Sequence, residues 1–224
     1  MTVAYDQNRL LNLKMYPFSD GATRKARDFS GYGYHGSENG FVGDDSEYRN
    51  DGIRQVVDLN IKFFDCGGAS FFGLIGNITL ECLFSCPLTQ PYAGLIGKYN
   101  DGVSGANRSY RLGVFNTGLV QVNFGTGTTA LSTVTTVDNR NYNYAVATYD
   151  GAAVRLYLNG SPNASVASSG NLFVNSHTLY VGSDGDGATG NRMIGSIAQA
   201  GVFSRVLGAA EIYDRCIKIM NGLL

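Results

Sequence analysis

The sequence has neither an excess of charge of one sign nor a long apolar run. Among its 224 residues, 17 Lys and Arg stand against 18 Asp and Glu, which leaves a formal charge of −1 at pH 7. Nucleic-acid-binding proteins usually carry a basic excess or a basic stripe, so we expect no nucleic-acid partner. A membrane-spanning helix needs about 20 consecutive apolar residues, and no such run occurs. We therefore expect no insertion into a membrane.

Cysteine is scarce, and its spacing argues against a zinc site. The four cysteines are Cys66, Cys82, Cys86 and Cys216, without a Cys-x-x-Cys pair. On a strand that rises about 3.3 Å per residue, Cys82 and Cys86 lie about 13 Å apart, too far for a disulfide, whose Cα atoms lie about 4.4–6.8 Å apart. We expect both thiols to act as small buried hydrophobes in a reduced, structural role. The predicted inward row is Leu80, Cys82, Phe84 and Cys86.

Histidine occurs twice and tryptophan not at all. With only His35 and His177, a Ser-His-Asp or Cys-His arrangement has few possible members, so we expect both histidines to be structural or exposed. The first ten residues lack a basic segment followed by an apolar segment, so no secretory signal is predicted. Three origins stay open: a mature piece of an exported protein, a product kept inside a cell, or a protein assembled in a host cell and released later, as in a virus particle.

Glycine is plentiful, with 30 residues against four prolines, which suits many tight turns. The most informative segment is 144–160, where two strand-like runs flank Asp150-Gly151 and Asn159-Gly160 follows. Both dipeptides favour hairpin turns because they tolerate positive φ. In the second run, one face carries Val154, Leu156 and Leu158, and the other carries Arg155, Tyr157 and Asn159. This alternation predicts a strand with one buried and one wet side.

Short strands separated by turn residues recur along the chain, which predicts an all-β antiparallel sandwich rather than a parallel sheet. We expect one domain over residues 1–224, with an N-terminal arm at 1–10. Apolar residues at helical spacing predict one helix over 204–220, which ends at Asn221-Gly222 and packs on the sandwich. The predicted strands are 71–74, 78–86, 93–99, 110–116, 119–124, 133–137, 144–149, 153–158, 165–167, 178–182 and 194–203.

Several motifs occur in the order found in one known family. They are 16–21 (YPFSDG), 28–36 (DFSGYGYHG), 78–84 (ITLECLF), the hairpin 147–160, 179–182 (LYVG), 194–197 (IGSI) and 202–212. In these segments the chain resembles the concanavalin A-like lectin/glucanase superfamily, in its laminin G-like branch. The resemblance implies a two-sheet antiparallel jelly-roll sandwich, and the strand pattern supports this fold independently.

The departures from the family pattern bear on metal binding. Tyr142 stands where the family commonly has Trp, and Tyr144 where it commonly has His. After 194–197 the family usually continues with Asp-Glu-Val, whereas this chain has Ala-Gln-Ala. The missing carboxylate is one that supports a structural calcium in relatives, and calcium takes about six to eight oxygen ligands. Asp28 with loop carbonyls stays the candidate for a structural calcium, and no other cofactor is expected.

Hydrolysis of a glycosidic bond is not expected. Glycosidases set two carboxylates across the substrate, and the glucanases of this superfamily carry them as Glu-x-Asp-x-x-Glu or a close variant. No such run occurs. Glu81 stands alone between Leu80 and Cys82, and we interpret it as an outward-facing strand residue. The expected protein is not an enzyme.

Two loops are candidates for ligand contact. Asp184 and Asp186 lie in a Gly-rich loop that does not match calcium-loop spacing, so it is either a hairpin loop or a ligand contact at the rim of the sandwich. Tyr99 and Asp101 are interpreted in the same way. The 14 tyrosines suit a sugar platform, a protein interface or ordinary sheet packing, and the sequence does not separate these uses.

Two functional hypotheses follow. The first is a non-enzymatic, lectin-like structural or adhesive protein of a virus particle, such as a bacteriophage capsid decoration or a tail or fibre component. Its partners would be other virion proteins, copies of itself and a cell-surface glycan, and it would assemble in the host cytoplasm. The alternative is an extracellular carbohydrate-binding module or lectin domain from a secreted bacterial protein. Fold alone does not decide between them.

Overall fold

The computed structural model describes residues 8–20, 23–30, 32–39, 48–60, 62–68, 70–99, 108–126, 129–132, 134–185 and 191–223. The strands are β1 (Arg9–Asp20), β2 (Thr23–Asp28), β3 (Gly36–Asn39), β4 (Tyr48–Asn50), β5 (Gln55–Asn60), β6 (Phe63–Asp65), β7 (Ile78–Ser85), β8 (Tyr92–Tyr99), β9 (Arg108–Phe115), β10 (Val120–Phe124), β11 (Thr129–Ser132), β12 (Asn143–Tyr149), β13 (Ala153–Leu158), β14 (Ser161–Ala167), β15 (Tyr180–Val181) and β16 (Ile194–Phe203). The helices described are the 3-10 helix η1 (Ser70–Phe72) and the α-helix α1 (Ala209–Met220).

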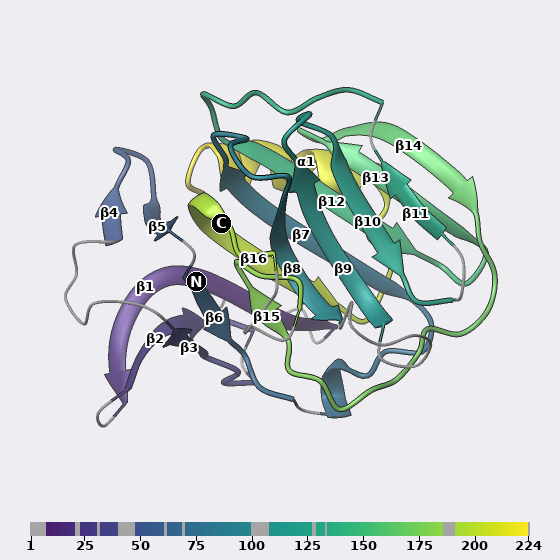
Figure 1. Cartoon of the computed structure of the whole chain (residues 1–224), viewed down its shortest axis with the longest axis horizontal. Helices are drawn as coiled ribbons and strands as arrows, with labels where there is room; N and C mark the ends of the chain where they lie inside the picture. Colours follow the sequence, from purple (N-terminus) through teal and green to yellow (C-terminus); the bar gives the residue numbers. More distant parts are fainter. Residues whose placement is uncertain are drawn as a thin grey trace.

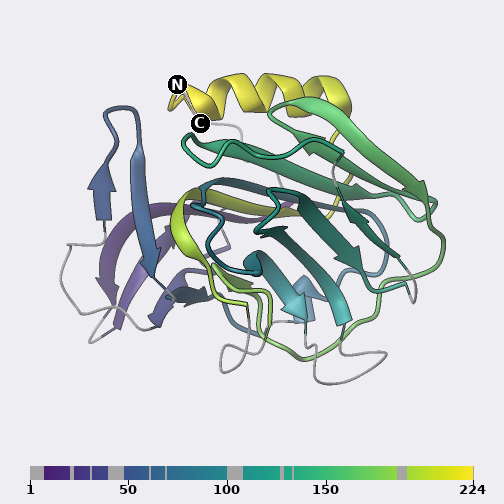
Figure 2. The same ribbon diagram turned by 45° about the horizontal axis from the view of Figure 1, so that its top comes forward.

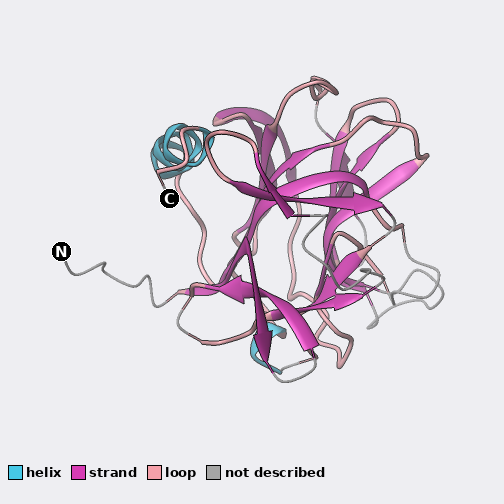
Figure 3. Ribbon diagram, turned by 90° about the vertical axis from the view of Figure 1, so that its left-hand side faces the viewer, coloured by secondary structure: helices cyan, strands magenta, loops and turns pink. Residues whose placement is uncertain are grey.

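The strands form two antiparallel layers that face each other (Figure 1; Figure 3). The first layer has the order β11-β10-β9-β8-β15-β6-β3, and the second has the order β14-β13-β12-β7-β16-β1. Strand β2 pairs with both β1 and β3, so the hydrogen-bonded ladder continues around one side of the sandwich. Strand β5 extends the second layer beside the start of β16, and β4 pairs with β5. The predicted two-sheet antiparallel sandwich is confirmed.

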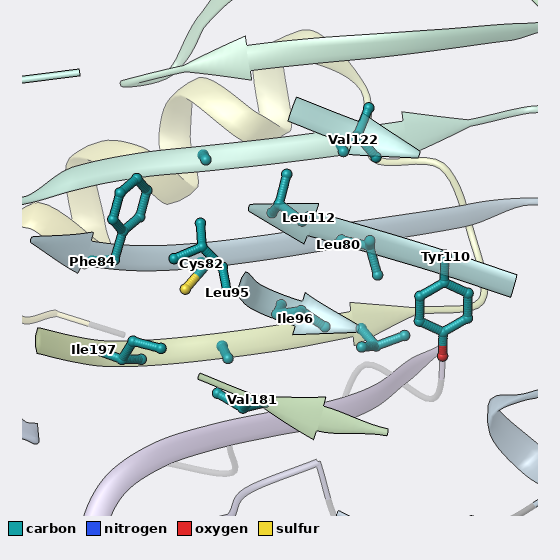
Figure 4. Packing of buried hydrophobic residues seen from close by; sticks show 14 of the residues in the cluster. Leu80, Cys82, Phe84, Leu95, Ile96, Tyr110, Leu112, Val122, Val181 and Ile197 are labelled. Carbon is teal, nitrogen blue, oxygen red and sulfur yellow. The ribbon is translucent and has the colours of Figure 1, made fainter. Parts of the chain in front are cut away.

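The main core fills the space between the layers (Figure 4). The predicted inward row of β7, from Leu80 through Cys82 to Phe84, faces side chains of β8, β9 and β10 such as Leu112 and Val122. Each of these side chains is almost completely buried. Burying a large aliphatic or aromatic side chain contributes about 1.5–3 kcal/mol, so this core supplies most of the driving force for folding. The four cysteines are buried and free, as the sequence predicts.

Helix α1 covers the outer face of the second layer (Figure 2). Its apolar stripe, Ile212, Cys216 and Ile219, packs on side chains of β7 and β12 that include Leu83 and Tyr144. This second cluster lies on the opposite side of β7 from the main core, so β7 is buried on both faces. The predicted packing of a C-terminal helix on the sandwich is confirmed. Neither described helix has the length and apolar character needed to cross a bilayer.

The hairpin that dominates the sequence pattern forms as predicted, but Tyr157, which was expected on the wet face, is buried in the second cluster. Leu158 pairs with Ser161, which leaves Asn159 and Gly160 as a two-residue turn between β13 and β14. Both turn residues have positive φ, 51° and 82°, which a tight type I′ turn requires. The buried face of β13 carries Val154, Leu156 and Leu158 into the main core.

Several sequence predictions of local structure are wrong. Segment 71–74 forms no strand, because η1 turns the fully buried Phe72 into the core. Segment 134–137 forms no strand either, and β11 lies at Thr129–Ser132 instead. The helix begins at Ala209 rather than at 204, because Gly208 is extended (φ −73°, ψ 155°) as its N-cap. The expected arm at 1–10 overlaps the described chain only from residue 8, and β1 begins at Arg9.

Candidate functional site

The outer face of β8 is built to receive a crossing loop. After β15, the chain turns at Gly182, whose amide donates to Leu95 O (2.9 Å), and then passes over β8. A Cβ atom at Gly94 or at Gly97 would overlap the backbone of Asp184, so only glycine permits this close approach. The Gly94 amide also donates to Asn191 O (2.7 Å), which fastens the returning end of the loop. Residues 182–184 and Asn191 are therefore fixed to the outer face of the first layer, and we call them the rim.

Arg111 of β9 is the centre of this arrangement. Its Nη1 donates to Asp184 Oδ2 at 3.1 Å, and the Asn191 side-chain amide donates to the same carboxylate at 3.2 and 3.3 Å. The guanidinium lies over the ring of Tyr99 (4.4 Å) and near the ring of Tyr92 (5.2 Å). A planar cation held between aromatic rings and a carboxylate is a rigid unit. We refer to Tyr92, Tyr99, Arg111, Asp184 and Asn191 as the Arg111 cluster.

The structure thus joins two of the four candidate contact residues and changes their role. Tyr99 is 3% exposed and Asp184 is 1% exposed, so neither is open to a ligand in this conformation. They position the rim of the first layer. Asp101 and Asp186, the other two candidates, lie outside the described residues.

Beside this cluster, β9 and β10 present polar side chains on their outer face. Val120, Val122 and Phe124 of β10 point into the core, so Gln121 and Asn123 point outward and are half-buried. Asn123 lies directly opposite Arg111 in the ladder, and within the described residues its side-chain amide makes no hydrogen bond. We call Arg111, Gln121 and Asn123 the β9–β10 face. The face carries two amides and one guanidinium within a small area, and the amide of Asn123 makes no hydrogen bond in the described part of the chain.

Asp28 is surrounded by donors rather than by oxygens. Its Oδ1 accepts from the amides of Asn12 (3.0 Å) and Ser30 (2.9 Å), and its Oδ2 accepts from Ser30 Oγ (2.6 Å) and the Tyr34 amide (3.0 Å). A cation at this carboxylate would meet these N–H and O–H groups, so the residues here do not fit a calcium ion. Within the described ranges, no group of three or more His, Cys, Asp or Glu side chains is placed to hold a metal. Asp28 shapes the loop that follows β2.

Glu81 points away from the main core, as the sequence indicates, but the expectation that it faces solvent is wrong. It is fully buried under α1. Arg9 Nη2 donates to its carboxylate at 2.6 Å, Arg215 of α1 donates twice at 2.7 and 2.9 Å, and Tyr144 Oη donates at 2.6 Å. Burial alone would raise the pKa of Glu81, but the charges of Arg9 and Arg215 outweigh it and lower the pKa to about 2. We call Arg9, Glu81, Tyr144 and Arg215 the Glu81 cluster. It fastens α1 to β7.

The two histidines take local structural positions. His35 Nδ1 accepts from the Asp28 amide at 3.0 Å. The carbonyl of His177 accepts from Nζ of the buried Lys98. Neither contact resembles a nucleophile paired with a base.

Two residues of the Arg111 cluster, Arg111 and Asn191, were not predicted as site residues from the sequence. Arg111 was not recognised because its contact to Asp184 joins segments 73 residues apart, whereas Asn191 lies only seven residues from Asp184. The glycines of β8 were the available signal, since glycine inside a strand often marks a close backbone approach.

The described strands thus form a two-layer antiparallel β-sandwich. A family model for the concanavalin A-like lectin/glucanases superfamily matches residues 76–213, more than half of the chain. The chain therefore belongs to this superfamily, and the predicted resemblance is confirmed. No curated protein matches the chain at the sequence level.

Solved structures share the fold at low sequence identity. A Trypanosoma rangeli sialidase mutant displaying trans-sialidase activity is 15% identical, with a TM-score of 0.64 over 96% of this chain and 34% of that one. The Ruminococcus gnavus IT-sialidase CBM40 bound to α2,3 sialyllactose is 18% identical, with a TM-score of 0.56 over 66% and 86%. The receptor-binding domain of botulinum neurotoxin mosaic serotype C/D is 16% identical, with a TM-score of 0.62 over 96% and 51%. The chain thus spans about a third of the sialidase and half of the toxin domain.

Proposed function

We propose that this chain is a non-enzymatic, lectin-like module that binds a glycan on the β9–β10 face, beside the rim held by the Arg111 cluster. The observation that carries the proposal is Asn123, an outward amide that makes no hydrogen bond within the described residues and lies opposite Arg111. Sugar hydroxyls are donors and acceptors at once, and neighbouring amide and guanidinium groups satisfy them in pairs. The rigid rim lowers the entropy lost on binding.

The known structures support a carbohydrate ligand. The CBM40 domain, which shares the fold, was solved with α2,3 sialyllactose bound. At this level of identity the likeness concerns the fold, so the ligand of this chain is inferred from its own β9–β10 face.

The absence of catalysis is part of the proposal. A general acid for glycoside cleavage needs a raised pKa and an open position beside the substrate. The pKa of Glu81 is lowered instead, and its carboxylate is buried under α1. Asp184 is held by Arg111 and Asn191. A panel of glycosides that showed turnover by the purified chain, lost on Glu81→Gln or Asp184→Asn, would overturn this part.

The test of glycan binding is a glycan array probed with the full chain and two variants. Asn123→Ala removes the outward amide of β10, and we expect about fivefold to tenfold weaker binding, the worth of one good hydrogen bond. Asn60→Ala removes an exposed amide at the end of β5, on another part of the molecule (Figure 1), and should leave binding unchanged. Failure of the wild-type chain to bind any glycan, or equal binding by Asn123→Ala, would contradict the proposal.

As the setting of this module we propose a virus particle, such as a bacteriophage capsid decoration or a tail or fibre component that contacts other virion proteins or its own copies. The supporting observation is that all four cysteines are buried and free, which suits a chain that folds in a reducing cytoplasm. The alternative is a carbohydrate-binding module of a secreted bacterial protein. Immunogold labelling of purified particles distinguishes them, because a module of a secreted protein would leave the particles unlabelled.

A further inference from the structure

A small cavity of about 50 Å³ lies on the outer face of the second layer, beside the C-terminal end of α1. Its polar walls are Lys14, Arg54, Gln55 and Gln199, and Leu83 and Ile219 are among its apolar walls. One water needs about 10–15 Å³ of such space, so the cavity has room for a group of three or four atoms. Ile53, which also lines it, is 55% exposed and marks its mouth.

The charge of the lining residues has one sign. Lys14 and Arg54 contribute two cations, and none of the described residues that line the cavity is Asp or Glu. Arg54 is fixed in place, because it pairs with Asp51 at 2.8 Å and donates to the last carbonyls of α1. Within the described residues, the contact of the Lys14 ammonium is the ring of Phe29, 5.2 Å away. Lys14 therefore lines the cavity, and its ammonium, placed over the Phe29 ring, has no carboxylate partner in this part of the chain.

The region behind the cavity is connected with the buried charges under α1. Gln199, directly opposite Lys14 in the β1–β16 ladder, donates to Glu81 Oε1 at 3.4 Å and so connects the cavity with the Glu81 cluster. That cluster sets two arginines against one carboxylate, and Asp28 is a second carboxylate whose charge acts on Arg9. Burial and then the charge of Arg9 lower the pKa of Lys14. An anion in the cavity would meet the positive charge of Lys14, and their attraction is strengthened because such a region screens charge poorly.

We propose that this cavity binds a small carboxylate, with Lys14 as its charge partner and Arg54 as the second cation. The cavity admits a carboxyl group but not a sugar ring, so the remainder of a larger acid would lie outside, at Ile53. The site is on the opposite outer face of the sandwich from the β9–β10 face. It does not depend on the proposed glycan site.

The test is an NMR titration of the full ¹⁵N-labelled chain with sodium acetate, using sodium chloride at the same ionic strength as the reference. We expect saturable shifts of the amides of Leu83 and Gln199 with acetate. Lys14→Met keeps the aliphatic stem against Phe29 but removes the charge, and it should weaken acetate binding about tenfold or more. Lys218→Met removes an exposed lysine of α1 that pairs with Asp214 and should bind like the wild type.

Two further arms make the result decisive. Glucuronate in place of acetate shows whether the carboxyl group of a sugar acid also enters, with the same dependence on Lys14. Lys14→Gln, which keeps a polar end, replaces Lys14→Met if the latter does not fold. The proposal is overturned if acetate produces no saturable shift at Leu83 and Gln199, or if the Lys14 variant binds acetate as tightly as Lys218→Met does.

Discussion

The Glu81 cluster offers the sharpest test of how α1 is held on the sandwich. Glu81→Gln keeps the shape of the side chain but leaves Arg9 and Arg215 buried without a counter-charge. Removing one partner of a buried ion pair costs about 3–5 kcal/mol. A second route agrees: lowering the pKa from 4.5 to about 2, at about 1.4 kcal/mol for each pKa unit, corresponds to about 3 kcal/mol. We expect Glu81→Gln to lower the free energy of unfolding at pH 7 by about 3 kcal/mol or more.

The pH dependence follows from the sign of this shift. Because the pKa of Glu81 is lower in the folded chain, its stabilisation is complete above pH 4.5 and is lost as the pH falls towards 2. The difference in free energy of unfolding between wild type and Glu81→Gln should therefore shrink over this range. Urea unfolding at a series of pH values measures it. Glu211→Gln, which breaks the partly exposed pair with Arg205, is the control and should cost less than about 1 kcal/mol. If Glu81→Gln lowers the free energy of unfolding as little as the control does, or by an amount that stays constant from pH 4.5 to 2, the ion pairs of Glu81 do not hold α1 on the sandwich.

Three further changes test other parts of the structure by urea unfolding. Gly97→Ala should lower the free energy of unfolding by about 1–3 kcal/mol and weaken glycan binding, because its Cβ would displace Asp184 and the rim. Unchanged stability and binding would show that the rim adjusts freely. Gly160→Ala should lower the free energy of unfolding by about 1–2 kcal/mol, because φ is 82° there. Gly151→Ala isolates the backbone contribution, because φ is 84° and an added Cβ would meet no atom within 4 Å. An unchanged free energy of unfolding at either position would contradict the turn geometry. Burial lowers the pKa of Lys98 to about 8, so the folded chain favours the uncharged amine. The wild type should accordingly gain stability relative to Lys98→Met as the pH rises from about 8 to 10.5, and a constant difference would count against this.

The parts of the fold that the sequence predicts correctly are those encoded locally. Alternation of apolar and polar residues along 153–158 and the Asn159-Gly160 dipeptide specify a strand and a turn within a few residues. The same holds for the inward row of β7. The strand predicted at 71–74 is wrong because a short run with two phenylalanines is equally apolar in a strand and in a buried turn.

The N-terminal strands were harder to predict because their partners are far away in the sequence. Strand β1 pairs with β16 near the other end of the chain, and β3 pairs with β6. Only the family motifs at 16–21 and 28–36 pointed to structure in this region. A strand that has no hairpin partner nearby in the sequence forms only through its tertiary contacts, so its local pattern is a weak signal.

The candidate site shows the same division. Tyr99 and Asp184 were recognised from loop composition, but their meeting point at Arg111 arises only when β9 and the loop after β15 come together. The direction of Glu81 followed from the alternation of β7, whereas its burial depends on a helix more than 120 residues further along the chain. Alternation assigns a residue to a face of a sheet but does not say what covers that face.

The central claim is that the β9–β10 face binds a glycan, and NMR mapping with the best ligand from the array tests it most directly. If this face binds the glycan, amide shifts will cluster at Arg111, Gln121 and Asn123, and Asn123→Ala will weaken them while Asn60→Ala will not. Shifts confined to the α1 side of the molecule, or no shifts with any glycan, would contradict it.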